Sequence, residues 1–122
     1  MAKVELTEAP SAKIIAIAAR THTVTDSLGR SITIGKPKPL DNLDFAKAIG
    51  AEGQNIGYQM ECGHLKFVRA IDGEPVVTPG SESELRVLYA RLADEGNEAV
   101  RQGIVEHLIA ETQATEAEVK NS

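Results

Sequence analysis

The stretch SITIGKPKPLDNLDFAKAIG, from Ser31 to Gly50, changes abruptly from the pattern of a strand to the pattern of a helix. Its first part alternates, with Ile32 and Ile34 on one face, which is typical of a β-strand. Pro37 and Pro39 then end the strand, because proline has no N–H for the ladder and forces the preceding residue to be extended. This stretch therefore predicts a boundary between a sheet and a helix.

The second part of the same stretch predicts a helix over about residues 40–49. Pro39 suits its first turn, where the missing N–H would have no partner in any case. Asp41 and Asp44 lie near the positive end of this helix and Lys47 near its negative end, and Gly50 closes it. We expect the buried face to be the apolar stripe of Leu40, Leu43, Ala46 and Ile49.

Two β-hairpins are predicted, one before this helix and one after it. Residues 21–34 form the first, with turn residues at Asp26-Ser27-Leu28-Gly29. Residues 65–77 form the second, because Asp72-Gly73 is a strong hairpin signal and Pro75 keeps the return strand short or at an edge. Residues 51–63 fit either a short helix or a mobile loop.

The clearest helical pattern lies in the last third of the chain. Ser81 and Glu84 have the spacing of a capping box. The apolar residues that follow recur at i, i+3, i+4 and i+7 and then continue beyond Asp94-Glu95-Gly96-Asn97, where we expect the helix to break and Asn97 to cap the next one. This stripe comprises Leu85, Leu88, Tyr89 and Leu92, followed by Ala99, Val100, Ile104, His107 and Leu108.

Together these elements predict an α+β fold in a single domain. A small antiparallel sheet made of the two hairpins packs against the mid-chain helix and the C-terminal helices. We expect the globular domain to span residues 1–113, with a loose arm over 1–11 and a frayed tail over 114–122. Residues 14–19 read as a strand or a short helix, with the strand preferred.

The composition is that of an ordinary globular domain, with 122 residues, 42% hydrophobic and 25% charged. The formal net charge of -5 arises entirely after residue 79, and neither the neutral part before it nor the acidic part after it is basic, which disfavours a nucleic-acid partner. The only cysteine, Cys62, can form no intrachain disulfide, which fits a reducing compartment. The sequence shows no signal peptide and no membrane span, so we expect a cytoplasmic protein.

The reactive residues form no recognisable catalytic or metal-binding motif. Cys62 and His64 could be half of a metal site, but such a site needs three or four ligands, and His22 and His107 lie in other predicted elements. Cys62 could also pair with a histidine as a nucleophile, yet no oxyanion loop or orienting carboxylate accompanies it. The glycines lack the spacing of a phosphate loop. We therefore assign no catalytic, cofactor-binding or metal-binding residue.

Two features favour binding of another protein. Lys36 and Lys38 alternate with Pro37 and Pro39 and form a rigid basic segment, although a solvated linker is the preferred interpretation of them. The long apolar stripe of the C-terminal helices could leave surface for a partner helix or a second copy of the chain. The candidate contact residues are Leu85, Leu88, Tyr89, Leu92, Val100, Ile104 and Leu108, together with the two lysines.

The order of two segments, GRSITIGKPKPLDNLDFAKAIG and AIDGEPVVTPGSESELRVLYARLADEG, resembles the tail assembly chaperones of long-tailed bacteriophages and prophages. The resemblance covers about residues 29–96 and includes no catalytic motif. It implies a non-enzymatic protein of the host cytoplasm, absent from the mature virion. Its implied partners are the tape measure protein, which it keeps soluble, and the tail tube protein. The alternative is another small phage or bacterial interaction module, such as an adaptor or inhibitor.

Overall fold

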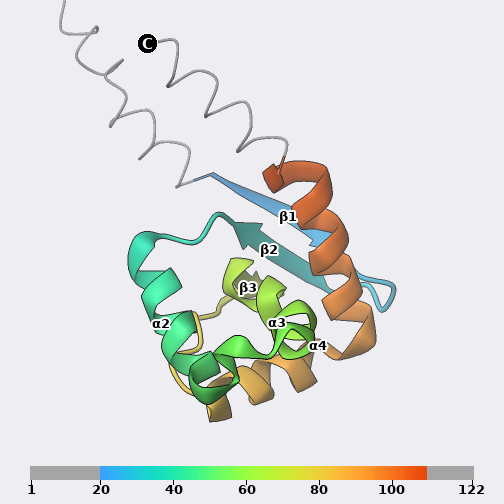
Figure 1. Ribbon diagram of the computed structural model, residues 1–122. Coiled ribbons are helices and arrows are strands. Elements are labelled where there is room, and N and C mark those ends of the chain that lie inside the picture. Colours follow the sequence, from blue (N-terminus) through green and yellow to red (C-terminus); the bar gives the residue numbers. More distant parts are fainter. Residues whose placement is uncertain (1–19, 110–122) are drawn as a thin grey trace, which may run out of the picture.

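A four-stranded antiparallel sheet, in the order β1-β2-β3-β4, forms the centre of the computed structural model, and three helices pack against it (Figure 1). The predicted α+β class is therefore confirmed. The structure describes residues 20–109. The expectations for the arm over 1–11, the segment 14–19 and the tail over 114–122 lie outside the described residues.

The first hairpin forms as predicted, from β1 (Thr21–Thr25) and β2 (Ser31–Gly35). Asp26 builds its turn, because one carboxylate oxygen accepts hydrogen bonds from the backbone N–H groups of Leu28 and Arg30, both at 2.9 Å. Gly29 supplies the positive φ of 86° that this turn requires. Polar turn chemistry that was visible in the sequence thus fixes the register of the two strands.

The second hairpin is shorter than expected. It consists of β3 (Val68–Ile71) and the two-residue β4 (Glu74–Pro75), joined through Asp72 and Gly73, which both have positive φ. The prediction that a strand begins at Leu65 was wrong, because Gly63–Phe67 forms a 3-10 helix, η3. His64 and Leu65 are both buried, and neighbouring residues of a strand would point to opposite faces.

Helix α2 (Pro39–Ile49) forms where predicted but buries a different face. Phe45 and Ala48 pack in the core. Leu40 and Leu43, which we expected inside, are 71% and 66% exposed. Ala46 is exposed as well, and Ile49 is half-buried. The predicted stripe was therefore wrong for Leu40, Leu43 and Ala46.

The rotation of α2 is fixed by an ion pair at its start. Asp41 accepts hydrogen bonds at 2.9 Å from the Arg69 guanidinium on β3 and from the backbone N–H of Lys38. The same guanidinium binds the carbonyl of Lys36. Burial alone would raise the pKa of the Asp41 carboxyl, but these hydrogen bonds and the charge of Arg69 hold that pKa below its usual value. With Asp41 held against the sheet, the inward positions lie four and seven residues later, at Phe45 and Ala48.

The ambiguous stretch after α2 is helical. A 3-10 helix, η2 (Gly50–Gln54), leads into α3 (Ile56–Cys62). Asn55 caps α3, because its side-chain oxygen accepts a hydrogen bond of 3.1 Å from the N–H of Tyr58. Of the two alternatives drawn from the sequence, the short helix is the one that forms.

Helix α4 (Glu82–Gly103) continues into a π-helix, η4 (Ile104–Ile109). Its predicted cap is present, since the Ser81 hydroxyl accepts a hydrogen bond of 3.2 Å from the N–H of Glu84. The Glu84 carboxylate accepts in turn from the N–H of Gly80, one residue earlier than in the usual capping box. The local sequence therefore fixed the start of α4.

Helix α4 breaks at Ala93, whose φ of 58° and ψ of -174° interrupt the helical path. Figure 1 shows the resulting bend, with the earlier part of α4 low in the view and the later part rising alongside β1 and β2. Asn97 does not cap the second part as predicted. Its side-chain amide instead donates to the carbonyls of Tyr89 and Ala93, at 3.1 and 2.7 Å, and so binds the turn that contains the break.

Arg30, at the base of the first hairpin, binds the same break. Its guanidinium donates to the carbonyls of Arg91 and Leu92, at 2.8 and 2.5 Å. Asp26 holds the guanidinium in place through a 2.7 Å ion pair in which the carboxylate side chain is fully buried. Gly96 leaves room for this contact, because a Cβ there would lie 3.1 Å from the guanidinium.

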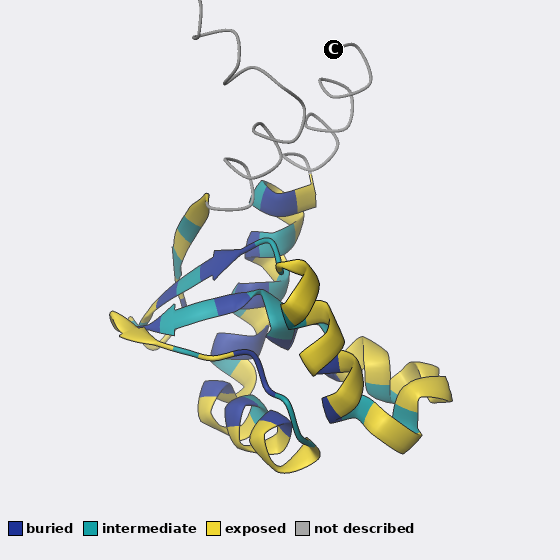
Figure 2. Ribbon diagram, turned by 90° about the vertical axis from the view of Figure 1, so that its left-hand side faces the viewer, coloured by how far each residue is buried: buried dark blue, intermediate teal, exposed yellow. Residues whose placement is uncertain are grey.

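The later part of α4 lies very close to the sheet. A Cβ at Gly103 would come within 2.9 Å of both Val24 and Ile34, so only glycine allows this approach. Buried positions accordingly run along the middle strands and one side of the helices (Figure 2). The largest fully buried side chains, from the sheet, η3 and both parts of α4, are Ile32, Ile34, Leu65, Val68, Leu92 and Val100.

We predict that Gly103→Ala lowers the free energy of unfolding by about 1–3 kcal/mol, the usual cost of overpacking a core. This loss should occur even though alanine is the better helix former. Urea unfolding followed by circular dichroism measures it. Gly63→Ala is the control, because a Cβ there meets nothing within 4 Å. Equal stability of the Gly103→Ala variant and the original protein would contradict the close packing described here.

Candidate binding groove

The structure places most of the apolar candidate residues in the core. Their helical spacing was correct, but a core face and a partner-binding face have the same spacing. Tyr89 and Ile104 are half-buried. The buried members are Leu85, Leu88, Leu92, Val100 and Leu108, each at most 6% exposed.

The basic segment before α2 is an ordered connection. Lys36 is half-buried and Lys38 is exposed. Their backbone groups bind Arg69 and Asp41, as described above, so the segment is tied to the sheet and to α2. Neither lysine lines the groove described next.

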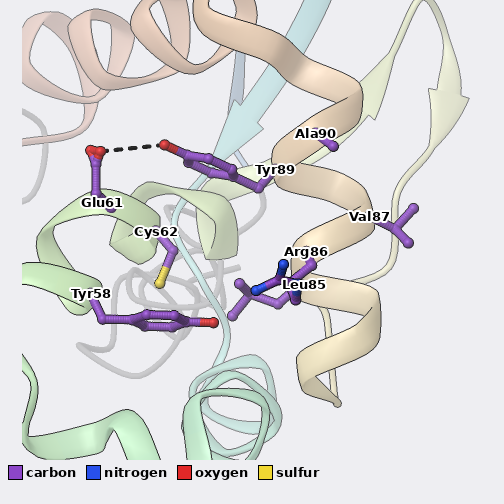
Figure 3. Close-up of a pocket in the computed structure, with 8 residues that line it drawn as sticks. All are labelled: Tyr58, Glu61, Cys62, Leu85, Arg86, Val87, Tyr89 and Ala90. Carbon is purple, nitrogen blue, oxygen red and sulfur yellow. Dashed lines mark hydrogen bonds between the residues drawn. The ribbon is translucent and has the colours of Figure 1, made fainter.

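A groove of about 530 Å³ lies between α3 and the earlier part of α4 (Figure 3). Tyr58 and Cys62 face across it toward α4, and Leu85 forms part of the opposite wall. The lining is mainly apolar, with charged groups from Glu61 and Arg86. Its residues are Tyr58, Glu61, Cys62, Leu85, Arg86, Val87, Tyr89 and Ala90.

Polar contacts hold the two walls of this groove together. The Tyr89 hydroxyl donates to the Glu61 carboxylate at 3.3 Å. Arg101, in the later part of α4, donates to the Glu61 carbonyl at 2.9 Å. Because Arg101 follows the break in α4, the bend at Ala93 lets one helix contact α3 at two separate places.

Burial shifts the pKa values of two groups that line the groove. Partial burial raises the pKa of the Tyr58 hydroxyl, and the negative charge of Glu82 adds to this effect. Burial also raises the pKa of the Cys62 thiol. Since the thiolate is the nucleophilic form, a thiol with a raised pKa is poorly suited to covalent catalysis at neutral pH.

Both helices that form the groove carry exposed apolar side chains, although only Val87 of the following three lines it. Ile56 and Met60 on α3 are 71% and 75% exposed, and Val87 on α4 is 65% exposed. Single exposed aliphatic side chains are common, so Ile56 and Met60, which do not line the groove, need no functional explanation. An apolar groove that an exposed residue such as Val87 lines is typical of protein–protein contact sites. The arrangement favours binding of an apolar surface.

The histidines considered as ligands have structural contacts instead. His64 is buried and lies 2.6 Å from the Asn97 side-chain oxygen through Nε2. His22 and His107 stack on each other with ring centroids 4.7 Å apart, a proximity that the sequence did not indicate. Within residues 20–109, no cluster of three or more His, Cys, Asp or Glu side chains could hold a metal ion.

No known family model, curated protein or solved structure matches this chain. Among the helices between residues 20 and 109, none has both the length and the apolar character needed to cross a membrane.

Sequence reasoning missed most of the residues that line the groove. Tyr58, Glu61, Arg86, Val87 and Ala90 were not among the candidate residues. The stretch that contains α3 had no decisive pattern, so its pairing with α4 could not be foreseen. Only Tyr89 and Leu85 belong both to the predicted contact set and to the groove lining.

The buried imidazole of His64 predicts a pH-dependent stability. Burial lowers its pKa below 6.5, and the charge of Arg101 acts in the same direction, whereas Asn97 and Glu61 partly oppose the shift. The unfolded chain therefore binds a proton at a higher pH than the folded chain does. Stability is complete above pH 6.5 and falls as the pH drops from there toward the folded-state pKa.

Urea unfolding measured over this pH range tests the prediction. His64→Gln should flatten the dependence, because glutamine keeps a hydrogen-bonding group but does not titrate. Any contribution of the stacked His22 and His107 is common to both proteins. Asp26 and Asp41, whose pKa values lie below 3.8, act at lower pH. An unchanged slope in the variant would show that His64 is not responsible.

Proposed function

We propose that this protein is a non-enzymatic tail assembly chaperone, which binds an apolar helical segment of the phage tape measure protein. The observation that supports it is the apolar groove between α3 and α4. A groove between two helices that is lined by aliphatic and aromatic side chains suits one face of an amphipathic helix. The resemblance of residues 29–96 to tail assembly chaperones supplies the identity of the partner.

The chemistry of the lining suits such a helix. Tyr58 and Tyr89 offer flat apolar faces with polar ends, so they can cover an apolar side chain while keeping their hydroxyls near the rim. Glu61 and Glu82 place negative charge around the site. We therefore expect the bound segment to carry apolar residues on one face and lysine or arginine at its flanks.

A chaperone of this kind shields its partner until assembly and then releases it. An open groove with a few apolar side chains suits reversible binding better than a fully enclosed cavity does. Its place of action would be the host cytoplasm, where it would keep the tape measure protein soluble and help to recruit tail tube subunits. It would be absent from the finished virion.

An adaptor or inhibitor with another target is the alternative. A second groove, of about 360 Å³, lies between α2 and α3, and Phe45, Ala46 and Ile49 line one side of it. The exposed Leu40 and Leu43 belong to the same helix α2. A partner bound on this side would point to the alternative.

Ala90→Glu tests the proposed groove directly. Ala90 is exposed on α4 and lines the groove, so glutamate there places a charged and longer side chain in the apolar contact. We predict that the variant loses about tenfold or more in affinity, which is equivalent to about 1.4 kcal/mol. The measurement is copurification and titration with helical fragments of the tape measure protein from the same phage genome.

Ala46→Glu is the matched control, because Ala46 is an exposed helical alanine that lines the other groove. It should leave the affinity unchanged. If Ala46→Glu weakens binding and Ala90→Glu does not, the partner binds at the groove beside α2. Absence of binding by the original protein would count against the tape measure protein as the partner, and the groove would then need another occupant.

A further inference from the structure

Helix α4 breaks one residue before the stretch of residues 94–97 in which the sequence predicts a break, and the backbone at the break is strained. Ala93 has a φ of 58° and a ψ of -174°, a backbone region that is almost restricted to glycine. Alanine is also the strongest helix former, and the residues on both sides of it are helical. A continuous helix through this segment would relieve the strain at Ala93, although Gly96 is a weak helix former.

The bent form depends on side chains from elsewhere in the molecule. The Arg30 guanidinium and the Asn97 amide together satisfy four carbonyls around the break, those of Tyr89, Arg91, Leu92 and Ala93. In a continuous helix, the N–H groups of following residues would satisfy these carbonyls. The bend and the straight helix are therefore two ways to pair the same backbone groups.

The segment after the break, residues 94–109, is here called the α4 arm. Its principal contacts are with earlier parts of the chain. Gly103 lies against Val24 and Ile34, and His107 stacks on His22. Elsewhere, Asn97 binds His64 and Arg101 binds the Glu61 carbonyl. A second copy of the chain offers every one of these surfaces in the same arrangement.

We propose that the α4 arm exchanges between two copies of this chain, so that each arm docks on the sheet of the other copy. In this dimer, Ala93 adopts helical backbone angles, and α4 runs through it without a break. A straight arm would extend about 24 Å beyond the break at 1.5 Å per residue, away from its own sheet. The exchanged dimer keeps the arm–sheet contacts and loses the strained backbone at Ala93, whereas Arg30 and Asn97 stabilise the monomer. Exchange of an identical element is an economical route to a dimer.

Cross-linking between two cysteine variants of the chain tests the exchange. One protein carries Cys62→Ala with His22→Cys, and the other carries Cys62→Ala with His107→Cys. The two are mixed, partly unfolded in urea, refolded at high concentration and treated with a short bismaleimide. Exchange predicts a covalent dimer that contains one chain of each kind. A dimer without this heterologous link would overturn the proposal, and so would a monomer at every concentration.

Two substitutions should change the association constant of the dimer in opposite directions. Ala93→Gly relieves the strain of the bend and weakens a continuous helix, so the association constant of the dimer should fall by about tenfold. Asn97→Ala removes two hydrogen bonds of the bend and should raise that constant by a similar factor. Gly63→Ala, where a Cβ meets nothing within 4 Å, is the control.

Sedimentation equilibrium gives the association constant of each variant. Circular dichroism first establishes that each variant is folded. If Asn97→Ala does not fold, the association constants of Ala93→Gly and the original protein still test the proposal. Equal constants for these two proteins would overturn it.

Discussion

The capping of the broken helix by Arg30 and Asn97 is the contact on which the arrangement of the other elements depends. The break at Ala93 leaves backbone carbonyls without helical partners, and leaving such groups unpaired is costly when they are buried. Arg30 brings the first hairpin to them, with Asp26 holding its guanidinium. Asn97 brings η3 to them through His64. One set of hydrogen bonds therefore joins the hairpin, η3 and both parts of α4.

The bend allows α4 to contact both α3 and the sheet. Its earlier part forms a wall of the groove opposite α3, while its later part covers β1 and β2 at the close approach that Gly103 permits. A straight helix could not lie along both surfaces. Arg101 also reaches back to the end of α3, so the groove and the packing of the sheet are mechanically connected.

A second polar contact decides what the other face of the molecule offers. The ion pair between Asp41 and Arg69 sets the rotation of α2 and leaves Leu40 and Leu43 in solvent. An amphipathic helix usually buries its largest aliphatic residues, so this arrangement gives up apolar burial. It also places two exposed leucines on the helix that borders the smaller groove. Buried or half-buried charges thus control both the internal geometry and the pattern of exposed apolar surface.

The sequence by itself determined the elements whose signals are local. The turn chemistry of Asp26 and Asp72-Gly73, the cap at Ser81 and the periodicity of Leu85 to Leu92 depend on neighbours within a few residues, which is why they could be predicted. Only the tertiary structure decided which face of α2 is buried, how the carbonyls at Ala93 are paired and that α3 and α4 enclose a groove. These outcomes depend on Arg69, Arg30 and Asn97 contacting groups far away in the chain, and no local pattern records such contacts.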